Sequence, residues 1–217
     1  AAGFASSYTT DNASNSLFEL AFSGTDSRGI NGIAYILRGT SYGDVRILTG
    51  DSGAPDLMDI YGVGDVRGAA NMVGTAQGYP TMLGKFPSMN GEDNVTLFRV
   101  EEMHLIAAET SLRAGNAADA LSYLNNIPAI RGLGADYYAS ATLENILEER
   151  RKEFAFEGLR FHDLSRMGMD MPQIDSFKQL NDDLTGTPPA YGSHRYAYPI
   201  ALAERNANPN MVQNYGY

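Results

Sequence analysis

A stretch of helical periodicity in the middle of the chain constrains the fold more than any other feature of its 217 residues. From Met103 to Leu112, apolar residues recur at the spacing of one helix face. The turn residues Ala114-Gly115-Asn116 follow, and a second helix is predicted from about Ala117, weakened at Pro128. Two helices joined by so short a turn form an αα-hairpin, much as in a tetratricopeptide unit.

A third helix is predicted to begin at Thr142, a suitable N-cap, and to run to Phe156, with Gly158 just beyond its end. Its interior carries the charged run Glu148-Glu149-Arg150-Arg151-Lys152-Glu153. Glu148 and Lys152 stand four positions apart, a pairing that stabilises a helix by only about 0.3 kcal/mol. We interpret this run as a face exposed to solvent.

The chain before the helices is rich in glycine and has short apolar runs between turn residues. Residues 17–22 alternate apolar and other side chains, which predicts a short strand, and residues 33–37 and 45–48 are further predicted strands. Residues 50–87 are predicted to be mostly loop, because glycine and proline recur throughout them. Loops of this length are usually functional or disordered.

The end of the chain contains several prolines, so we expect ordered loop with few helical turns. These prolines are Pro172, Pro188, Pro189, Pro199 and Pro209. The predicted fold is therefore mainly α, with tetratricopeptide-like helical repeats, long irregular loops and a few short strands. It divides into a loop-rich and glycine-rich region over 1–96, helical hairpins over 97–167 and a wrapping segment over 168–217, all within one domain.

Composition excludes several classes of protein. The formal net charge of −10 repels phosphate backbones, so nucleic acid is not an expected partner. The absence of cysteine removes disulfides, thiolate metal sites and cysteine nucleophiles. No apolar window is long enough for a membrane helix, and the start at Ala1, without Met or a leader sequence, suggests a mature or trimmed product.

No motif for catalysis or cofactor binding stands out. The three histidines, His104, His162 and His194, accompany no G-x-S-x-G elbow and no H-E-x-x-H pair. Asp56, Asp59 and the other nearby carboxylates lack the order of a calcium loop. A glycosidase needs two carboxylates flanking a cleft, and the 26 acidic residues offer no means of choosing two. We expect no enzyme activity, no cofactor and no metal.

Two separated motifs carry a resemblance to a known family. Residues 148–168 read EERRKEFAFEGLRFHDLSRMG, and the chain closes with Tyr198-Pro199-Ile200, Asn208-Pro209-Asn210 and Gln213-Asn214-Tyr215-Gly216-Tyr217. Together they resemble the SusD/RagB family of outer-membrane nutrient-binding proteins. Weaker similarity at residues 16–22, 56–67 and 98–109 extends the resemblance from about residue 16 to the end, while the family's N-terminal half is absent.

The resemblance implies a SusD-like α-α superhelix that binds glycans or other nutrients without catalysis. It implies a place on the extracellular face of an outer membrane, reached through a lipid anchor that this chain does not contain. The implied partner is a SusC-like TonB-dependent transporter. The alternative is a tetratricopeptide-like adaptor that binds proteins, which needs at least three stacked helical pairs.

Two sets of side chains are site candidates. Arginines held by carboxylates across helix ends commonly join repeats, so one set is interpreted as a structural clamp: Arg150, Glu157, Arg160, Asp163 and Arg166. In the resembled family, insertions beside the repeats form the ligand groove, and aromatic rings stack on sugars. The second set, predicted to contact ligand, is Tyr35, Arg38, Tyr42 and Tyr61, with core packing as the alternative for each.

Overall fold

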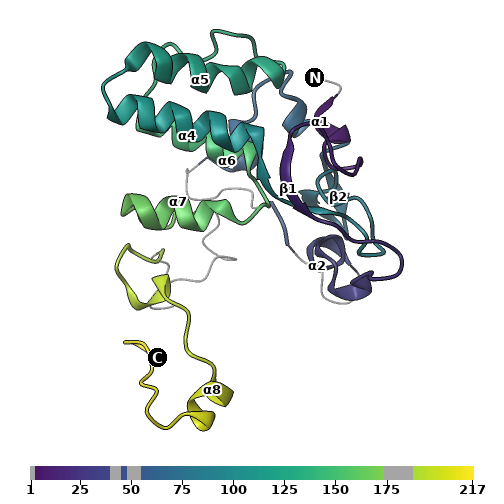
Figure 1. The fold of residues 1–217 in the computed structure, drawn as a ribbon, viewed down its shortest axis with the longest axis vertical. Coiled ribbons are helices and arrows are strands. Elements are labelled where there is room, and N and C mark those ends of the chain that lie inside the picture. The colour runs from purple at the N-terminus through teal and green to yellow at the C-terminus, as the bar shows by residue number, and fades with distance from the viewer. Residues whose placement is uncertain (1–2, 40–44, 48–54, 174–187) are drawn as a thin grey trace. The chain divides into compact units, whose positions relative to one another are not determined.

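The computed structural model describes residues 3–39, 45–47, 55–173 and 188–217. These residues fall into two units: unit 1 holds those up to Gly158, and unit 2 holds those from Leu159 to Tyr217. Unit 1 contains the long helices and two small antiparallel ribbons (Figure 1). Among the described residues, no helix is both long and apolar enough to cross a membrane.

The predicted αα-hairpin is present in unit 1. Helix α4 (Val100–Arg113) and helix α5 (Ala117–Ile130) lie side by side (Figure 1), and α6 (Leu143–Glu153) packs against both. Gly115 joins the hairpin at φ 82°, a conformation that a Cβ atom disfavours. The apolar side chains that these helices bury completely include Leu105, Ala108, Ala120, Leu124, Ile127 and Ile146.

Proline does not weaken α5 as the sequence suggested. The helix continues through Pro128 to Ile130, and the Arg131 N–H closes it by donating to the carbonyls of Ile127 and Pro128. The Pro128 side chain is fully buried. Apolar packing around the ring therefore outweighs the one helical hydrogen bond that proline cannot donate.

The third helix begins as predicted and ends earlier. Thr142 is its N-cap, and its hydroxyl accepts the Asn145 N–H at 3.1 Å. The helix stops at Glu153 rather than Phe156, because Phe156 adopts φ 67°, outside the helical region.

Two antiparallel ribbons complete the regular structure of unit 1. Strand β1 (Ser16–Leu20), within the predicted strand at 17–22, pairs with β4 (Val95–Arg99). Strands β2 (Val73–Ala76) and β3 (Tyr79–Met82) form a hairpin inside the tract predicted as loop. Its turn residues, Gln77 and Gly78, both have positive φ, which suits a tight hairpin turn.

The strand predicted at residues 33–37 is wrong. Helix α2 (Ile33–Arg38) follows a 3₁₀ turn, η1 (Gly29–Asn31), and buries Ala34 and Leu37 on one face. A short apolar run does not distinguish a strand from a helix by periodicity. Residues 45–47 form no strand, and residue 48 lies outside the described residues.

Three short elements complete the description of unit 1. They are α1 (Gly3–Ser6), α3 (Leu57–Ile60) and the 3₁₀ turn η2 (Val66–Gly68). Asp56 caps α3, accepting the N–H groups of Met58 and Asp59 at 2.7 and 3.0 Å. Phe4 of α1 is buried in an apolar cluster with Met72 and Met82.

The interior of unit 1 contains a buried charge cluster. It consists of four cations and five carboxylates: Arg67, Lys85, Arg99, Arg131, Asp65, Glu101, Glu149, Glu153 and Glu157. Glu153 is its centre and is fully buried. It accepts hydrogen bonds from Arg99 Nη1 at 2.5 Å, Arg131 Nη2 at 2.7 Å and Arg67 Nη1 at 3.1 Å.

The interpretation of the charged run in α6 as a solvent-exposed face is wrong. Glu149, Lys152 and Glu153 are each at most 1% exposed. Glu149 pairs with Arg67 at 2.6 Å and accepts the Tyr138 hydroxyl at 2.9 Å. Glu149 and Glu153 are buried because cations from distant parts of the chain neutralise them, a condition for burying charge in a protein interior. Glu148 is exposed and pairs with Lys152 at 2.8 Å.

Unit 2 contains one longer helix and two short ones. Helix α7 (Leu159–Met167) is followed by the 3₁₀ turn η3 (His194–Tyr196) and by α8 (Leu202–Ala207). Helix α7 falls within residues 97–167, which were predicted to form helical hairpins, although no separate helix was predicted there. The described part of 168–217 has few helical turns, as expected. Phe161 packs near Tyr196, with ring centroids 5.6 Å apart.

We predict that Glu153→Gln lowers the free energy of unfolding by about 3 kcal/mol, because three buried guanidinium groups lose a shared counter-charge. Urea unfolding of the full-length protein measures the change. Arg113→Ala is the control, because the Arg113 side chain is 53% exposed and its ion pair with Glu109 should contribute only about 0.5 kcal/mol. Equal effects of the two substitutions would contradict a stabilising role for the cluster.

We also predict a loss of stability in acid. Burial opposes ionisation of Glu153, but the charges of Arg99, Arg131 and Arg67 outweigh it and hold its pKa well below the ordinary 4.5. A carboxyl whose pKa is lowered by folding stabilises the protein above its unfolded pKa, and this contribution is lost as pH falls. The urea midpoint should therefore decline below about pH 4.5. Glu153→Gln should show a shallower decline.

Candidate functional site

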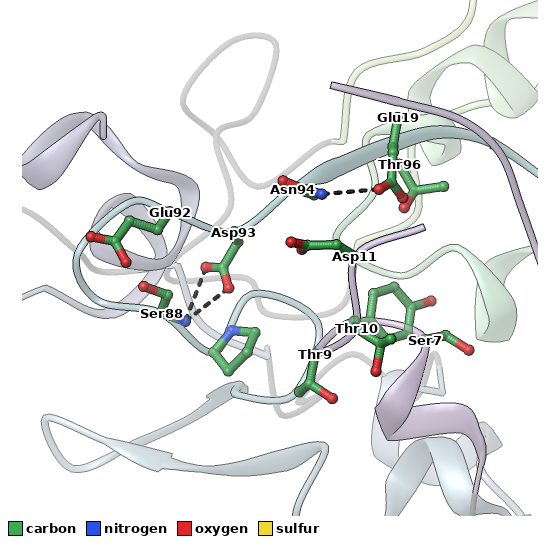
Figure 2. Close-up of a pocket in the computed structure, with 12 residues that line it drawn as sticks. Ser7, Thr9, Thr10, Asp11, Glu19, Ser88, Glu92, Asp93, Asn94 and Thr96 are labelled. Atoms are coloured by element: carbon green, nitrogen blue, oxygen red, sulfur yellow. Dashed lines mark hydrogen bonds between the residues drawn. The ribbon is translucent and has the colours of Figure 1, made fainter. Parts of the chain in front are cut away.

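A polar pocket lies in unit 1 between the N-terminal segment and the β1–β4 ribbon (Figure 2). Its volume is about 260 Å³. The lining residues come from the segment after α1, from both strands of the ribbon and from the loop before β4: Ser7, Tyr8, Thr9, Thr10, Asp11, Glu19, Pro87, Ser88, Glu92, Asp93, Asn94 and Thr96. The pocket is therefore built mostly from hydroxyl, amide and carboxylate groups.

A tight turn forms the wall before β4. Both Asp93 carboxylate oxygens accept the Ser88 N–H, at 2.9 and 3.0 Å (Figure 2). Gly91 in this turn has φ 70°, and a Cβ atom there would lie 2.7 Å from the Gly29 nitrogen. Only glycine fits so close an approach. Burial raises the pKa of Asp93, and this outweighs the lowering by the Ser88 N–H and the nearby Arg38 charge.

Glu19 of β1 is hydrogen-bonded both to the N-terminal segment and to the loop before β4. Its carboxylate accepts the Asn12 N–H at 2.8 Å and Asn94 Nδ2 at 2.9 Å (Figure 2). Asn94 in turn accepts the Phe22 N–H at 2.8 Å. Burial opposes ionisation of Glu19, but hydrogen bonds from Asn12, Ser16 and Asn94 outweigh it and lower its pKa. This carboxylate is therefore charged at neutral pH.

Four polar side chains of the pocket have no hydrogen bond or ion pair to another described residue. They are Thr10, Asp11, Glu92 and Thr96. In Figure 2, the Asp11 side chain lies between Asn94 and Thr10. Polar groups that the protein leaves unbonded are available to a ligand, and they accept or donate as polyhydroxyl compounds require.

A second cavity, of about 350 Å³, adjoins this pocket. Asp93 lines both, so the two hollows share a wall. The second cavity is more apolar and is lined by Phe22, Ile33 and Val95, with the Arg28 guanidinium carbon 5.4 Å from the Phe22 ring centroid. One surface region therefore combines a polar hollow with an apolar one.

Three of the four residues predicted to contact ligand lie outside the lining of the polar pocket: Tyr35, Arg38 and Tyr61. Arg38 donates to the backbone carbonyls of Phe86 at 2.6 Å and Pro87 at 3.0 Å, which fixes the loop leading to the pocket. The Tyr61 hydroxyl donates to the Lys152 carbonyl at 3.1 Å, so this ring packs beside α6. Tyr35 is half-buried in α2, and Tyr42 lies outside the described residues. Their role in ligand contact stays a prediction.

The five predicted clamp residues are divided between the two units. In unit 1, Glu157 accepts Arg99 Nε at 3.0 Å, and Arg150 lies 3.6 Å from Glu102 and stacks on Phe154. In unit 2, Asp163 pairs with Arg166 at 2.9 Å. Arg160 precedes this pair in α7.

Sequence reasoning missed most of the charge cluster. Arg131 and Lys85 carry no motif. Arg67 and Arg99 lie in the stretches 56–67 and 98–109 that resemble the family, but no ion pair was predicted for either. Arg67 donates to Asp65 through Nε and Nη2, at 2.9 and 2.7 Å. The carboxylates considered for calcium are thus engaged in caps and ion pairs, and no group of acidic or histidine residues suited to a metal occurs among the described residues.

Comparison with protein families identifies one match. The model of the SusD family covers residues 77–217 of the chain. Among curated proteins, the starch-binding protein SusD of Bacteroides thetaiotaomicron is 32% identical over 126 residues. That match covers 58% of this chain and 22% of SusD, so only part of the relative is represented.

Solved structures are similar over nearly the whole chain. A SusD superfamily protein from Bacteroides thetaiotaomicron matches with a TM-score of 0.79 and 28% identity, covering 98% of this chain and 51% of that one. Surface glycan-binding protein A from Bacteroides fluxus matches with a TM-score of 0.68 and 26% identity, covering 99% and 54%. The chain spans about half the length of these structures.

We predict that Asp163→Ala lowers the melting temperature without selectively abolishing ligand binding. The carboxylate is buried, but Arg166 is 39% exposed and can be solvated when its partner is removed, so we expect a loss of only about 1–2 kcal/mol. Thermal unfolding and ligand titration of the full-length variant measure both quantities. Lost binding in a fully folded variant would contradict a structural role.

Proposed function

Because this chain belongs to the SusD family, we propose that it is part of a cell-surface protein that binds glycans for uptake. The family match over residues 77–217 is the observation that carries the proposal. A mainly α, SusD-like fold agrees with it. The relatives whose names specify a ligand are described as binding starch or surface glycans.

The polar pocket supports carbohydrate as the ligand. Sugars present many hydroxyl groups that both donate and accept, and the pocket offers acceptors and hydroxyls that no described residue occupies. The adjoining cavity adds the Phe22 ring, and flat aromatic faces pack against sugar C–H groups. We propose the polar pocket as a glycan contact site of this half of the protein.

Two further parts of the proposal rest on the family alone. We propose that a SusC-like TonB-dependent transporter receives the glycan. We also propose that the protein acts on the extracellular face of the outer membrane. In this scheme it binds glycan without making or breaking a bond.

The adaptor alternative is less well supported. It requires at least three stacked helical pairs. The described residues of unit 1 provide one hairpin, α4–α5, with α6 packed against it. The long irregular segments around the ribbons also have no counterpart in a simple helical array.

We predict that the full-length protein binds neutral oligosaccharides and leaves their length unchanged. Calorimetric titration with laminarihexaose, cellohexaose and maltohexaose measures binding, and chromatography after incubation measures chain length. Thr96→Val keeps the strand shape and removes one hydroxyl from the pocket, so affinity should fall roughly 2–10-fold. Enzyme-like turnover of any oligosaccharide would contradict a purely binding role.

A further inference from the structure

The polar pocket has a one-sided charge. Four of its lining side chains are carboxylates, from Asp11, Glu19, Glu92 and Asp93, and none is a lysine, arginine or histidine. Asp11 and Glu92 have no ion pair among the described residues. Glu19 has a lowered pKa, because its hydrogen bonds outweigh the effect of burial. A ligand therefore meets several negative charges at neutral pH.

The nearest arginines are already engaged. The Arg38 guanidinium donates to the carbonyls of Phe86 and Pro87 and does not line the pocket. The positive charge of Arg38 acts on the Asp93 carboxylate, which lines both cavities, and lowers its pKa against the larger effect of burial. Arg28 belongs to the adjoining cavity, near the Phe22 ring. Among the described residues, the polar pocket is therefore lined by no side-chain cation that could pair with an acidic group on a ligand.

This arrangement favours one class of sugar. The hydroxyls of an uncharged sugar donate to carboxylates, and hydrogen bonds to a charged acceptor are stronger than neutral ones. A uronate or sulfate group instead meets like charges, and juxtaposed like charges oppose binding. Repulsion of this kind is a common source of specificity.

We infer that the polar pocket selects uncharged glycans and rejects those that carry uronate or sulfate groups. The inference rests on the proposed function, because it assigns a ligand class to the same pocket. Specificity arises here from the carboxylates of the pocket, of which Asp11 and Glu92 have no ion pair among the described residues. The sugar linkage plays no part in this discrimination.

The test compares two ligands that have the same sugar backbone and differ only in the group at C6. The probes are the neutral hexasaccharide that the full-length protein binds best and the same hexasaccharide oxidised at C6 to the uronate. At low salt the neutral probe should bind at least about tenfold more tightly. The difference in affinity between the two probes should become smaller at about 0.5 M NaCl, because salt screens repulsion between partly exposed charges.

Single substitutions test whether the pocket carboxylates are the source of the repulsion. Asp11→Asn and Glu92→Gln each remove one pocket charge while keeping side-chain size, so each should reduce the preference for the neutral probe several-fold. Asp136→Asn removes a charge from an exposed loop outside the pocket and should leave the preference unchanged. Thermal unfolding checks that all three variants fold as the unmodified protein does.

The possible results are separable. If the oxidised probe binds as tightly as the neutral one, or if neither pocket variant alters the preference, the inference is overturned while glycan binding stands. If sulfated or uronate oligosaccharides bind and neutral ones do not, the inference is likewise overturned. If no oligosaccharide of either kind binds, the proposed function fails as well.

Discussion

The structure of unit 1 depends on a single carboxylate that three guanidinium groups share. Glu153 brings together Arg67 of η2, Arg99 at the end of β4 and Arg131 just after α5. Desolvation of so many charges costs much of what their attraction contributes, so the cluster is weak evidence of net stability. The cluster instead fixes how the elements are arranged, because the three arginines can all bond to one buried carboxylate only when η2, β4 and α5 are correctly assembled.

The candidate site depends on this arrangement. Thr96 lies on β4, the strand that ends at Arg99, and Tyr8 lines the pocket while its hydroxyl donates to Glu157 at 3.1 Å. Glu157 in turn accepts a hydrogen bond from Arg99 Nε at 3.0 Å. One wall of the pocket is thus connected by a single hydrogen bond to the buried charge cluster. A change in the cluster should therefore alter the pocket without touching any group that faces a ligand.

Elements that depend on local periodicity and on neighbouring residues could be predicted from the sequence. The hairpin of α4 and α5, the Thr142 cap and the β1 strand follow from neighbouring residues. The burial of the charged run in α6 does not, because its partners Arg67 and Arg99 lie 86 and 54 positions from Glu153. The pocket was missed for a related reason. Threonine, asparagine and aspartate in loops carry no motif, and only the pairing of β1 with β4 brings them together.

Unit 1 contains two sets of acidic residues, one in its interior and one in the polar pocket, and they differ in whether cations lie beside them. In the interior, Asp65, Glu149 and Glu153 each pair with arginine, and burial without such cations would be prohibitive. In the pocket, Asp11 and Glu92 are solvated and have no paired cation among the described residues. Since charge and residue type are the same in both places, composition alone assigns neither role. The position of the arginines decides which acids are paired in the interior and which ones line the polar pocket.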